Sequence, residues 1–497
     1  MTVNSVSLGE LLAAVEAEAP GLLTLEQTTA TNSELMVTNV VQDSRDVVPG
    51  SVFCAVAGGL VDGRDFVDAA VDAGAIAVVV DRPTTTRVAE ILTTNTRRAT
   101  GYLAAAHVGQ PTHQIDLVGV TGTNGKTSVV TLLAHIIDAC CGAAASMGTL
   151  TGSLTTAAAP DFQRSLREHV DNGCSVVAAE ISSHALDQLR IAGSKVSVAI
   201  FTNLSQDHLD YHSDMEEYFE AKARLFAPEL GADAVIDVSS HWGARLADRV
   251  REQHDAGLFG DDHRLVTVDS AAVIAESTLE QQTSIFAWRG QSITLPLGGS
   301  FSVTNATLAG EAAVLLGYEV DAIATALSTS PPIPGRFESV DNGQPFAVVV
   351  DYSHTPASVE IAIESAREIS NGRVIIVFGA AGDRDPGKRP LMGAAATAAD
   401  IVYVTSDNAR TEDPEAIIDD VVVGLEASNR TPAEVHRVAD RAVAIRTAIT
   451  GAVPGDIVVI AGKGHEDYQI VGTTRTDFDD REHARSALVS LGWESAL

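Results

Sequence analysis

The chain has 497 residues, of which 45% are apolar, and its formal net charge at pH 7 is −33. So negative a chain is a poor partner for a nucleic-acid backbone, and its apolar content suffices for several folded cores. At about 150 residues per domain, the length predicts roughly three domains.

The start of the chain shows no signal for export or membrane insertion. Residues 1–20 contain three glutamates and no basic residue, which is unlike a secretory signal. No apolar run approaches the ~20 residues of a membrane helix. The four cysteines lack the spacing of a metal site or a disulfide framework. We therefore expect a cytoplasmic protein with reduced thiols and no membrane insertion.

Residues 1–110 mix short strands with helices. The polar segment Asp43-Ser44-Arg45 precedes an apolar stretch, and a helix leads into a strand expected at 75–80.

The most informative segment is 122–128, Gly-Thr-Asn-Gly-Lys-Thr-Ser. It follows the apolar run 117–120 and precedes apolar residues at helical spacing. This order is typical of a phosphate cradle, because glycine N–H groups and a helix N-terminus face the anion. Lys126 is expected to reach the β- and γ-phosphates, and the Thr127 hydroxyl to bind Mg²⁺. The loop is a variant, since Val120 stands where the standard motif has its first glycine.

Glu180 ends the next expected strand, 176–180. A carboxylate at this edge can coordinate Mg²⁺ or can cap the following helix, and both interpretations stay open. Segment 207–212, Asp-His-Leu-Asp-Tyr-His, is either a Mg²⁺ site, a zinc site or a solvated surface loop. Zinc is the least favoured, because a second ligand set is missing. Lys222 lies on an amphipathic helix, 218–226, where a solvated lysine normally pairs with Glu217 or Glu220.

The last part of the chain follows a Pro-rich linker at 328–335. Continuous apolar strands are expected at 346–350, 373–378, 401–405 and 456–460, with helical patterns between them. This alternation predicts an α/β fold with mostly parallel sheets covered on both faces. Polar loops follow three of these strands, at 379–389, 406–410 and 462–466. We expect them to converge at the carboxyl edge of one sheet and form a site.

These segments together resemble the Mur ligase family, the ATP-dependent amino-acid-adding enzymes of peptidoglycan synthesis. The similarity is greatest to the branch that adds the third residue and covers nearly the whole chain. It rests on motifs in the family's order: DSRDVVPGSVF from Asp43, GTNGKTS from Gly122, TT from Thr155, EISSHAL from Glu180, TNLSQDHLDYH from Thr202, YFEAKARLF from Tyr218, PGRFE from Pro334, DYSHTP from Asp351, GDRDPGKRP from Gly382, SDNAR from Ser406 and GKGHEDYQ from Gly462.

The resemblance implies three domains: a UDP-sugar-binding domain at 1–110, a central ATPase at 111–333 and a C-terminal Rossmann-like domain at 334–497. It also implies the reaction. The carboxylate of UDP-MurNAc-L-Ala-D-Glu attacks the γ-phosphate of ATP, and an amine then displaces phosphate from the acyl phosphate. The catalytic set implied is Lys126, Glu180, His208 and Lys222. Thr127 would bind one Mg²⁺, Glu180 and His208 would hold a second, and Lys222 would be carbamylated by CO₂ and support the metal site.

The resemblance also assigns binding residues. The expected ATP contacts are Gly122, Thr123, Asn124, Gly125, Lys126, Thr127, Ser128, Asn305, Arg336 and Asp351. The expected contacts to the nucleotide-sugar peptide are Ser44, Thr155, Thr156, Ser182, Gln188 and Arg190. The expected contacts to the incoming amino acid are Arg389, Asp407, Asn408, Ala409, Arg410, Gly462 and Glu466. The family usually has asparagine where this chain has Ser302.

The acceptor is expected to be meso-diaminopimelate, because Arg410 can pair with the carboxylate that lysine lacks. Ala409 replaces the proline of the family's D-N-P-R, so the acceptors L-lysine and L-ornithine stay open. Two further alternatives are a folylpolyglutamate-synthetase-like ligase and a non-catalytic nucleotide-sugar-binding relative. The partners expected are small molecules only, for a monomeric enzyme.

Overall fold

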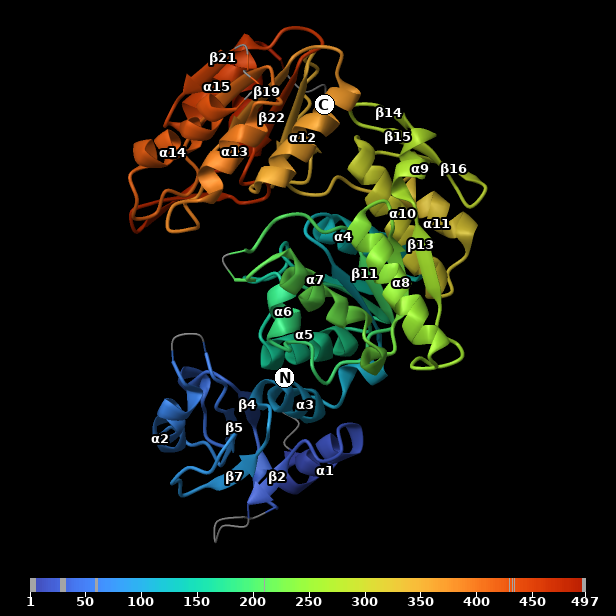
Figure 1. Cartoon of the computed structure of the whole chain (residues 1–497), viewed down its shortest axis with the longest axis vertical. Coiled ribbons are helices and arrows are strands. Elements are labelled where there is room, and N and C mark those ends of the chain that lie inside the picture. Colours follow the sequence, from blue (N-terminus) through green and yellow to red (C-terminus); the bar gives the residue numbers. More distant parts are fainter. Residues whose placement is uncertain are drawn as a thin grey trace.

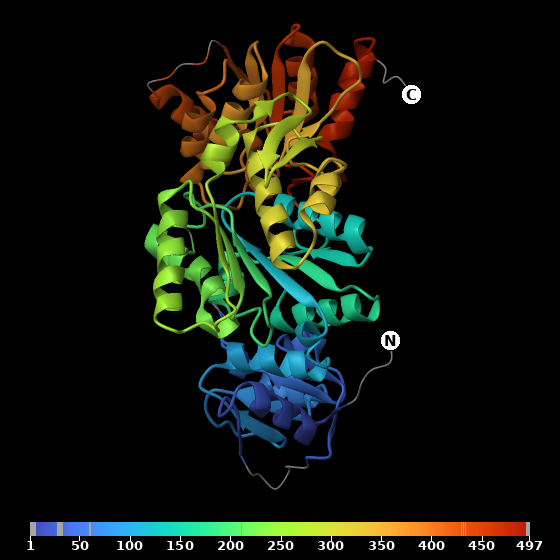
Figure 2. The ribbon, with the colours of Figure 1, turned by 90° about the vertical axis from the view of Figure 1, so that its right-hand side faces the viewer.

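The computed structural model describes residues 6–26, 33–58, 61–209, 211–428, 430, 432 and 434–493. Its elements form three groups stacked along the long axis, with the N-terminal group at one end and the C-terminal group at the other (Figures 1 and 2). Asp210 of the 207–212 segment lies outside the described residues. No helix among those described is long and apolar enough to cross a bilayer.

The N-terminal group is built on a five-stranded sheet in the order β2-β7-β6-β5-β4, parallel except for its β2 edge. Helices α1 and α3 pack on one face and α2 on the other. The elements are β1 (Val6–Ser7), α1 (Leu8–Glu18), β2 (Thr24–Glu26), β3 (Met36–Val37), β4 (Asn39–Val41), β5 (Ser51–Cys54), α2 (Val67–Asp72), β6 (Ala77–Val80), β7 (Ala89–Leu92) and α3 (Thr96–His107).

The central group is a six-stranded parallel sheet in the order β13-β12-β11-β8-β10-β9. Apolar side chains alternate between its faces, so α4, α10 and α11 cover one face and α5, α7 and α8 the other. Its elements are β8 (Asp116–Thr121), α4 (Lys126–Cys141), β9 (Ala144–Met147), α5 (Ala159–Asp171), β10 (Val176–Glu180), α6 (Ser183–Asp187), β11 (Val198–Phe201), α7 (Met215–Ala223), β12 (Asp233–Asp237), α8 (His241–Asp255) and β13 (Leu265–Val268).

A small antiparallel sheet, β14-β15-β16, and three helices complete this group and lead toward the C-terminal part (Figure 1). Helix α10 packs along α4, the helix that follows the glycine loop. The elements are α9 (Ser270–Ala275), β14 (Thr278–Leu279), β15 (Ser284–Trp288), β16 (Gln291–Leu295), α10 (Ser300–Leu315) and α11 (Val320–Leu327).

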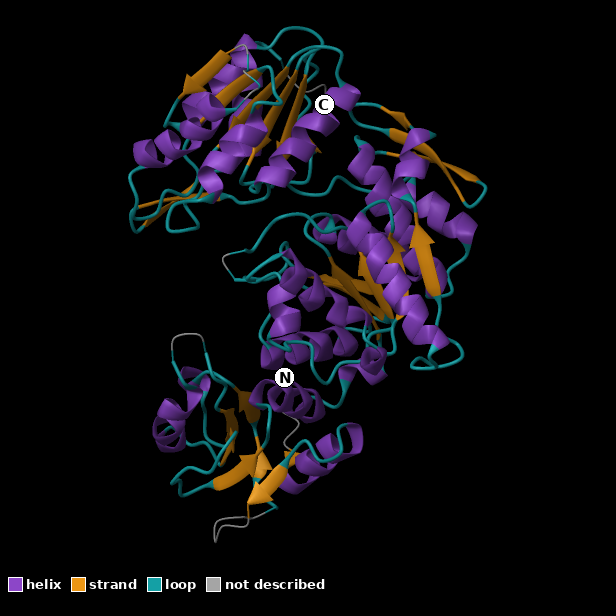
Figure 3. Cartoon of the chain, in the orientation of Figure 1, coloured by secondary structure: helices purple, strands orange, loops and turns teal. Residues whose placement is uncertain are grey.

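The C-terminal group has a six-stranded sheet in the order β17-β18-β22-β19-β20-β21, parallel except for β17. Helices α12, α13 and α14 cover one face, and α15 and α16 the other. Figure 3 shows the strands of this sheet with helices packed beside them. Its elements are β17 (Glu338–Ser339), β18 (Ala347–Asp351), α12 (Pro356–Ile369), β19 (Val374–Phe378), α13 (Lys388–Ala396), β20 (Ile401–Val404), α14 (Pro414–Ala427), β21 (Glu434–Arg437), α15 (Arg441–Gly451), β22 (Ile457–Ala461), β23 (Tyr468–Val471), β24 (Thr474–Asp477) and α16 (Asp480–Ser490).

The predicted α/β class with mostly parallel sheets is confirmed. Strand register sets the position of the central site: Val120 of β8 pairs with Glu180 of β10, and Thr121 pairs with Phe201 of β11. The three carboxyl ends therefore lie side by side, which is where open α/β sheets bind ligands.

Candidate functional site

The glycine loop between β8 and α4 depends on two residues without side chains. Gly122 has a φ of 151°, and a Cβ there would lie 1.9 Å from the Thr202 hydroxyl. Gly125 is the N-cap of α4 and has a left-handed conformation, and a Cβ there would lie 2.6 Å from Oδ1 of Asn305. Only glycine satisfies both the backbone angles and these close approaches. The loop is thus shaped by its neighbours into a cradle at a helix N-terminus.

Polar contacts fix the loop from the β11 side. The Asn124 amide donates to the side chain of Asn203, and the Thr202 hydroxyl donates to the Asn124 carbonyl at 2.6 Å. Lys126 folds back, and its Nζ donates to the carbonyls of Gly122 and Thr123 at 2.9 Å. Burial, above all, lowers the pKa of Lys126. Its ammonium therefore lies at the loop and is poorly solvated, which suits it to an incoming anion.

Thr127 and Glu180 meet at the mouth of this loop. The Thr127 hydroxyl donates to Oε1 of Glu180 at 3.0 Å, and the same oxygen of Glu180 accepts from the Thr149 amide at 2.8 Å. Glu180 is 2% exposed. It does not cap the following helix, because Ser182 does so by accepting from the Ala185 amide. Of the two sequence interpretations of Glu180, the capping one is therefore wrong.

Thr149 was missed by the sequence reasoning, although a signal was present. It follows Gly148, where an added Cβ would come within 2.3 Å of Oε1 of Glu180. Gly148 directly follows β9, the strand that pairs with the one ending at Glu180. A glycine at this position is the sequence signal of the close packing.

Lys222 on α7 is buried, with 1% of its surface exposed. Its Nζ donates to the Gly122 carbonyl at 2.8 Å and lies 4.6 Å from the centre of the Tyr218 ring. Burial, with the nearby Lys126 charge, lowers its pKa well below the ordinary value for lysine. The solvated-lysine interpretation is wrong, because Glu220 pairs with Arg249 instead and the carboxylate of Glu217 accepts from the Ser213 amide.

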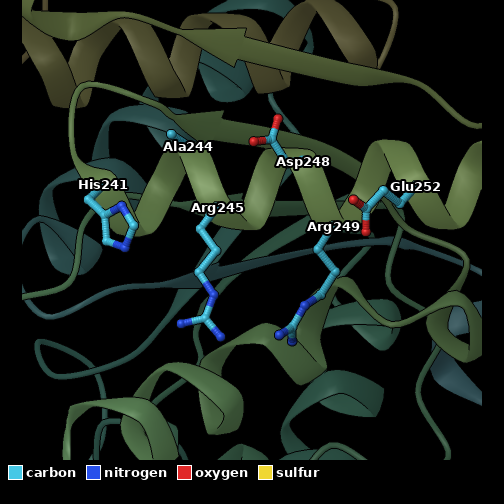
Figure 4. A pocket seen from close by; sticks show the side chains of 6 residues that line it. All are labelled: His241, Ala244, Arg245, Asp248, Arg249 and Glu252. Carbon is cyan, nitrogen blue, oxygen red and sulfur yellow. The ribbon is translucent and has the colours of Figure 1, made fainter.

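Helix α7 is held in place by α8. Arg245 and Arg249 of α8 form ion pairs with Glu216 and Glu220 of α7, and both guanidinium groups lie over the Phe219 ring. Figure 4 shows these arginines along an open surface pocket of about 420 Å³ on α8. This pocket is separate from the cradle, and its arginines secure the helix that carries Lys222.

His208 lies at the edge of the site in a left-handed conformation, with φ of 55°. Its ring is 4.9 Å from the ring of His184, and its Nε2 is 3.4 Å from Oδ2 of Asp207. Burial lowers the pKa of His208 to about 4, so the ring is neutral at pH 7, the form that binds metals. Asp207 also lies 3.5 Å from the ammonium of Lys388, which belongs to the C-terminal group.

Glu180, His208 and Thr127 supply oxygen and neutral nitrogen donors, which fit Mg²⁺ when phosphate and water provide the other ligands. Within the described ranges, no three His, Cys, Asp or Glu side chains form a group able to hold a metal by themselves.

Four of the residues expected to hold the nucleotide-sugar peptide, Thr156, Ser182, Gln188 and Arg190, form one network in the central group. Thr156 accepts from the Ser182 amide at 3.0 Å and donates to the Glu180 carbonyl at 2.8 Å. Arg190 donates to the Thr156 carbonyl at 2.6 Å and to Oε1 of Gln188 at 2.9 Å.

Two of the expected peptide contacts lie at the edge of this network or outside it. The Thr155 hydroxyl lies 3.3 Å from that of Thr149. Ser44 begins a short 3-10 turn, Ser44–Asp46, in the N-terminal group. In the part of the chain that the structure describes, no hydrogen bond joins Ser44 to the network.

Asn305 is buried on α10 and lies against Gly125 of the cradle. Ser302, at the position where the family usually has asparagine, donates to the Gly298 carbonyl of its own helix turn at 2.8 Å.

Arg336 brings the C-terminal group onto the cradle. Its Nη2 donates to the Thr127 hydroxyl at 2.7 Å, and its guanidinium lies 4.6 Å from the centre of the Tyr352 ring. Its Nε is buried with no partner among the described residues. Asp351 fixes this approach, because its carboxylate accepts from the amides of Phe337 and Ser353. Arg336 thus lies beside Thr127, and Asp351 holds the residue that follows Arg336.

The three polar loops of the C-terminal sheet lie together. The Asn408 side chain donates to Oε2 of Glu466 at 3.0 Å, and the buried Lys463 donates to the same oxygen at 3.0 Å. A Cβ on Gly462 would lie 2.7 Å from Oδ2 of Asp407. Arg410 donates from Nη1 to the Gly382 carbonyl at 3.1 Å.

Five members of this expected set are buried: Arg389, Asp407, Asn408, Ala409 and Gly462. Arg389 is 3% exposed, and ion pairs with Glu412 and Asp420 hold its guanidinium. Ala409 is fully buried. The sequence reasoning missed Glu412 and Asp420, which lie on a different helix and loop from Arg389, so no spacing in the sequence points to them.

The site combines a phosphate cradle with the Glu180 carboxylate, which lies beside the Thr127 hydroxyl. Arg336 of the C-terminal α/β group reaches the same hydroxyl. Together these features define a class of multidomain phosphate-loop enzymes. The comparisons give the family within this class. Residues 36–113, 120–313 and 335–464 match three models: "Mur ligase family, catalytic domain", "Mur ligase middle domain" and "Mur ligase, glutamate ligase domain".

Named relatives match along nearly the full length. A UDP-N-acetylmuramoyl-L-alanyl-D-glutamate–2,6-diaminopimelate ligase of Synechococcus sp. (strain WH7803) is 44% identical, over 91% of this chain and 94% of the relative. The enzyme of the same name from Geobacillus thermodenitrificans is 41% identical, over 90% and 94%. The chain belongs to the Mur ligase family, as the sequence motifs predicted.

Solved structures agree. A structure with the same ligase name has a TM-score of 0.67 and 31% identity, and the match covers 98% of this chain and 99% of that one. MurF from Acinetobacter baumannii has a TM-score of 0.62 at 16% identity, over 93% and 96% of the two chains. A Mycobacterium tuberculosis folylpolyglutamate synthase has a TM-score of 0.56 at 18% identity, over 74% and 92%. These last two share the fold alone.

Proposed function

We propose that this chain is an ATP-dependent, ADP-forming ligase that joins meso-diaminopimelate to UDP-MurNAc-L-Ala-D-Glu in peptidoglycan precursor synthesis. The observation that carries the proposal is the 40–44% identity, over 90% or more of the chain, with enzymes named for that reaction. The site supports it, because the cradle, the carboxylate and both lysines lie within one hydrogen-bonded cluster. The same cluster argues against a non-catalytic relative.

The chemistry proceeds in two steps. The D-glutamyl carboxylate attacks the γ-phosphorus of ATP, the bond to the β-phosphate oxygen breaks, and an acyl phosphate and ADP result. The acceptor amine then attacks the acyl carbon, loses a proton, and phosphate leaves as the amide forms. Lys126 and Arg336 bring positive charge to the phosphates, which offsets the repulsion between the carboxylate and the triphosphate.

Thr127, Glu180 and His208 are the residues that would hold Mg²⁺. The metal would supply charge neutralisation between phosphate oxygens and polarise the reacting phosphoryl group. Thr149 and Arg336 orient the Glu180 carboxylate and the Thr127 hydroxyl, which therefore need little rearrangement.

Lys222 would act as a carbamate. Only a neutral amine adds CO₂, and burial beside Lys126 favours the neutral form of Lys222. Addition of CO₂ releases a proton and converts the amine into an anion next to the metal ligands. In the described chain no carboxylate forms an ion pair with Lys222, so the carbamate would supply the negative charge that this part of the site lacks.

Arg410 supports diaminopimelate as the acceptor over L-lysine or L-ornithine. Its guanidinium donates to the Gly382 carbonyl, and the nearby side chain of Asn408 donates to Glu466. Arg410 would bind the distal carboxylate of diaminopimelate, and Glu466 its ammonium.

We propose three domains, at 1–110, 111–333 and 334–497, working as a cytoplasmic monomer. The first domain would bind the nucleotide sugar through Ser44, the second ATP, and the third the amino acid. Asn305, beside Gly125, would contact the nucleotide base. The peptide would be held by Thr155, Thr156, Ser182, Gln188 and Arg190.

The test is ADP and phosphate release from ATP with UDP-MurNAc-L-Ala-D-Glu, run in parallel with diaminopimelate, lysine and ornithine. We expect release that requires both the nucleotide sugar and diaminopimelate, with a product whose mass equals the two joined substrates less water. If the nucleotide sugar supports release with lysine but not with diaminopimelate, the acceptor assignment is overturned. Release that occurs only with a folate and glutamate would overturn the peptidoglycan-precursor assignment in favour of a folylpolyglutamate-synthetase-like ligase.

A further inference from the structure

The segment that carries the expected acceptor contacts, 407–410, is held by the hairpin formed by β23 and β24. The Ile470 amide donates to Oδ1 of Asn408 at 2.9 Å, and the Ile470 carbonyl accepts from the Arg410 amide at 3.1 Å. The Gly472 amide donates to the Arg410 carbonyl at 2.6 Å. Both backbone groups of Arg410 are therefore bound to the hairpin.

A fourth hydrogen bond comes from a side chain. Nε2 of Gln469 donates to the Asp407 carbonyl at 3.0 Å. Three consecutive hairpin positions, Gln469, Ile470 and Val471, thus run beside the segment, and Val471 forms a parallel bridge with Arg410.

The register of the hairpin leaves the N–H and C=O groups of Ile470 available for hydrogen bonds outside the hairpin. Ile470 lies opposite Arg475, and alternate residues of an antiparallel ladder direct their N–H and C=O away from the partner strand. Those of Ile470 face Asn408 and Arg410. The base of the hairpin is fixed by Tyr468, whose ring lies 5.1 Å from the Lys463 ammonium and 3.9 Å from the Arg475 guanidinium.

Arg410 needs such support. Its φ is 51°, a left-handed conformation that is unfavourable for a residue with a Cβ. The residue before it is Ala409, which lacks the fixed φ that a proline would impose. The conformation of Arg410 is therefore held by contacts from outside its own segment.

We propose that the β23–β24 hairpin is a specificity-determining clamp that fixes the backbone of Asp407, Asn408 and Arg410 and so aims the Arg410 guanidinium at the acceptor amino acid. The hairpin positions these residues without touching the acceptor itself. The identity of the acceptor rests on the proposed function, whereas the clamp itself does not.

The kinetic test uses two variants and one control. Gln469→Leu removes the donor to Asp407, and Ile470→Pro removes the amide donor to Asn408 at a position whose N–H is outside the hairpin ladder. Thr473→Ala, at the exposed turn of the same hairpin, is the control. We expect the KM for diaminopimelate to rise about 3- to 10-fold in Gln469→Leu and more in Ile470→Pro, since each loses one hydrogen bond.

The KM for ATP and the KM for the nucleotide sugar should stay unchanged, and discrimination between diaminopimelate and lysine should fall. Equal rises in all three KM values, or an unchanged KM for diaminopimelate in both variants, would overturn the clamp. If Ile470→Pro does not fold, Gln469→Leu decides.

Hydrogen–deuterium exchange separates the clamp from the proposed function. We expect the peptide covering 407–412 to exchange faster in both variants, while the peptide covering the glycine loop exchanges as in the parent. If the parent releases no ADP with diaminopimelate, the proposed function fails and the exchange data still decide the clamp. Unchanged exchange at 407–412 in both variants refutes it.

Discussion

The side-chain nitrogens of Lys126 and Lys222 donate to one oxygen, the Gly122 carbonyl, at 2.9 and 2.8 Å. Two ammonium groups that share one acceptor, one of them buried and the other half-buried, repel each other, and a single carbonyl cannot neutralise either. This pairing favours a neutral Lys222, whose pKa lies well below its ordinary value, beside a charged Lys126.

Replacing Lys222 by methionine keeps its volume and removes the amine. We expect a loss of activity of about 100-fold or more, because the group that would complete the metal site is gone. Added short carboxylic acids should restore part of it, and mass spectrometry of the parent peptide should show one added CO₂. Lys195→Ala, at an exposed lysine, is the control. Full activity in Lys222→Met would contradict the assignment.

The Thr127 hydroxyl joins Glu180 to Arg336, so Thr127→Val should remove two hydrogen bonds without changing the volume of the side chain. We expect kcat to fall about 100-fold, with a higher Mg²⁺ concentration needed for half-maximal rate. Thr127→Ser retains the hydroxyl and should keep most of the activity. Equal rates in the valine and serine variants would show that the hydroxyl has no part in the reaction.

Arg410→Ala should lower kcat/KM for diaminopimelate about 10- to 100-fold, because a charge-assisted pair with the distal carboxylate is lost. The kcat/KM for lysine should change little, so the selectivity ratio narrows. Arg384→Ala, at an exposed arginine of the neighbouring loop, controls for a general loss of positive charge. A selectivity ratio that stays at the parent value in Arg410→Ala would remove the role given to this arginine.

Asp456 gives a pH-dependent contribution to stability. Burial alone would raise the pKa of its carboxyl, but hydrogen bonds from Arg373 and from the Val453 amide more than offset this, so the pKa lies below its ordinary value. The stabilisation is therefore complete above the unfolded-state pKa of about 4 and is lost as the pH falls through the lower folded-state value.

Asp456→Asn should lower the free energy of unfolding by about 1–3 kcal/mol at pH 7 and by less near pH 2. Urea unfolding followed by circular dichroism at both pH values measures this difference. Asp467→Asn, at a carboxylate that is 77% exposed, should have little effect at either pH. A cost for Asp456→Asn that is the same at both pH values would contradict the assigned pKa direction.

Local patterns predicted much of the fold. The order of strand, glycine loop and helix at 117–137 is present, and strands expected from continuous apolar runs, such as 373–378, appear as Val374–Phe378. Helix α7 begins at Met215, three residues before the predicted start, because Asp214 caps it. Periodicity identifies an apolar face well but identifies a helix end only where a capping side chain is recognised.

Contacts between segments far apart in sequence were beyond that reasoning. Arg336 reaches Thr127 across 209 residues, and Lys388 lies beside Asp207 across 181. The burial of Lys222 depends on α7 packing against the sheet and on the Gly122 carbonyl, neither of which its own helix pattern reveals. Composition and spacing describe one segment at a time, whereas these contacts are set by how the sheets are stacked.

Thr149 has a consequence for how substrates influence each other. Its amide donates to Glu180, one of the proposed Mg²⁺ ligands. Its hydroxyl lies beside that of Thr155, which is expected to contact the peptide. A ligand that shifts this stretch must also shift the carboxylate, so the two binding events are energetically linked. Thermodynamic reciprocity then requires that magnesium tighten or weaken the peptide by the same factor by which the peptide alters magnesium. Ordered loading of the enzyme can thus arise from one short turn, without any large movement of whole domains.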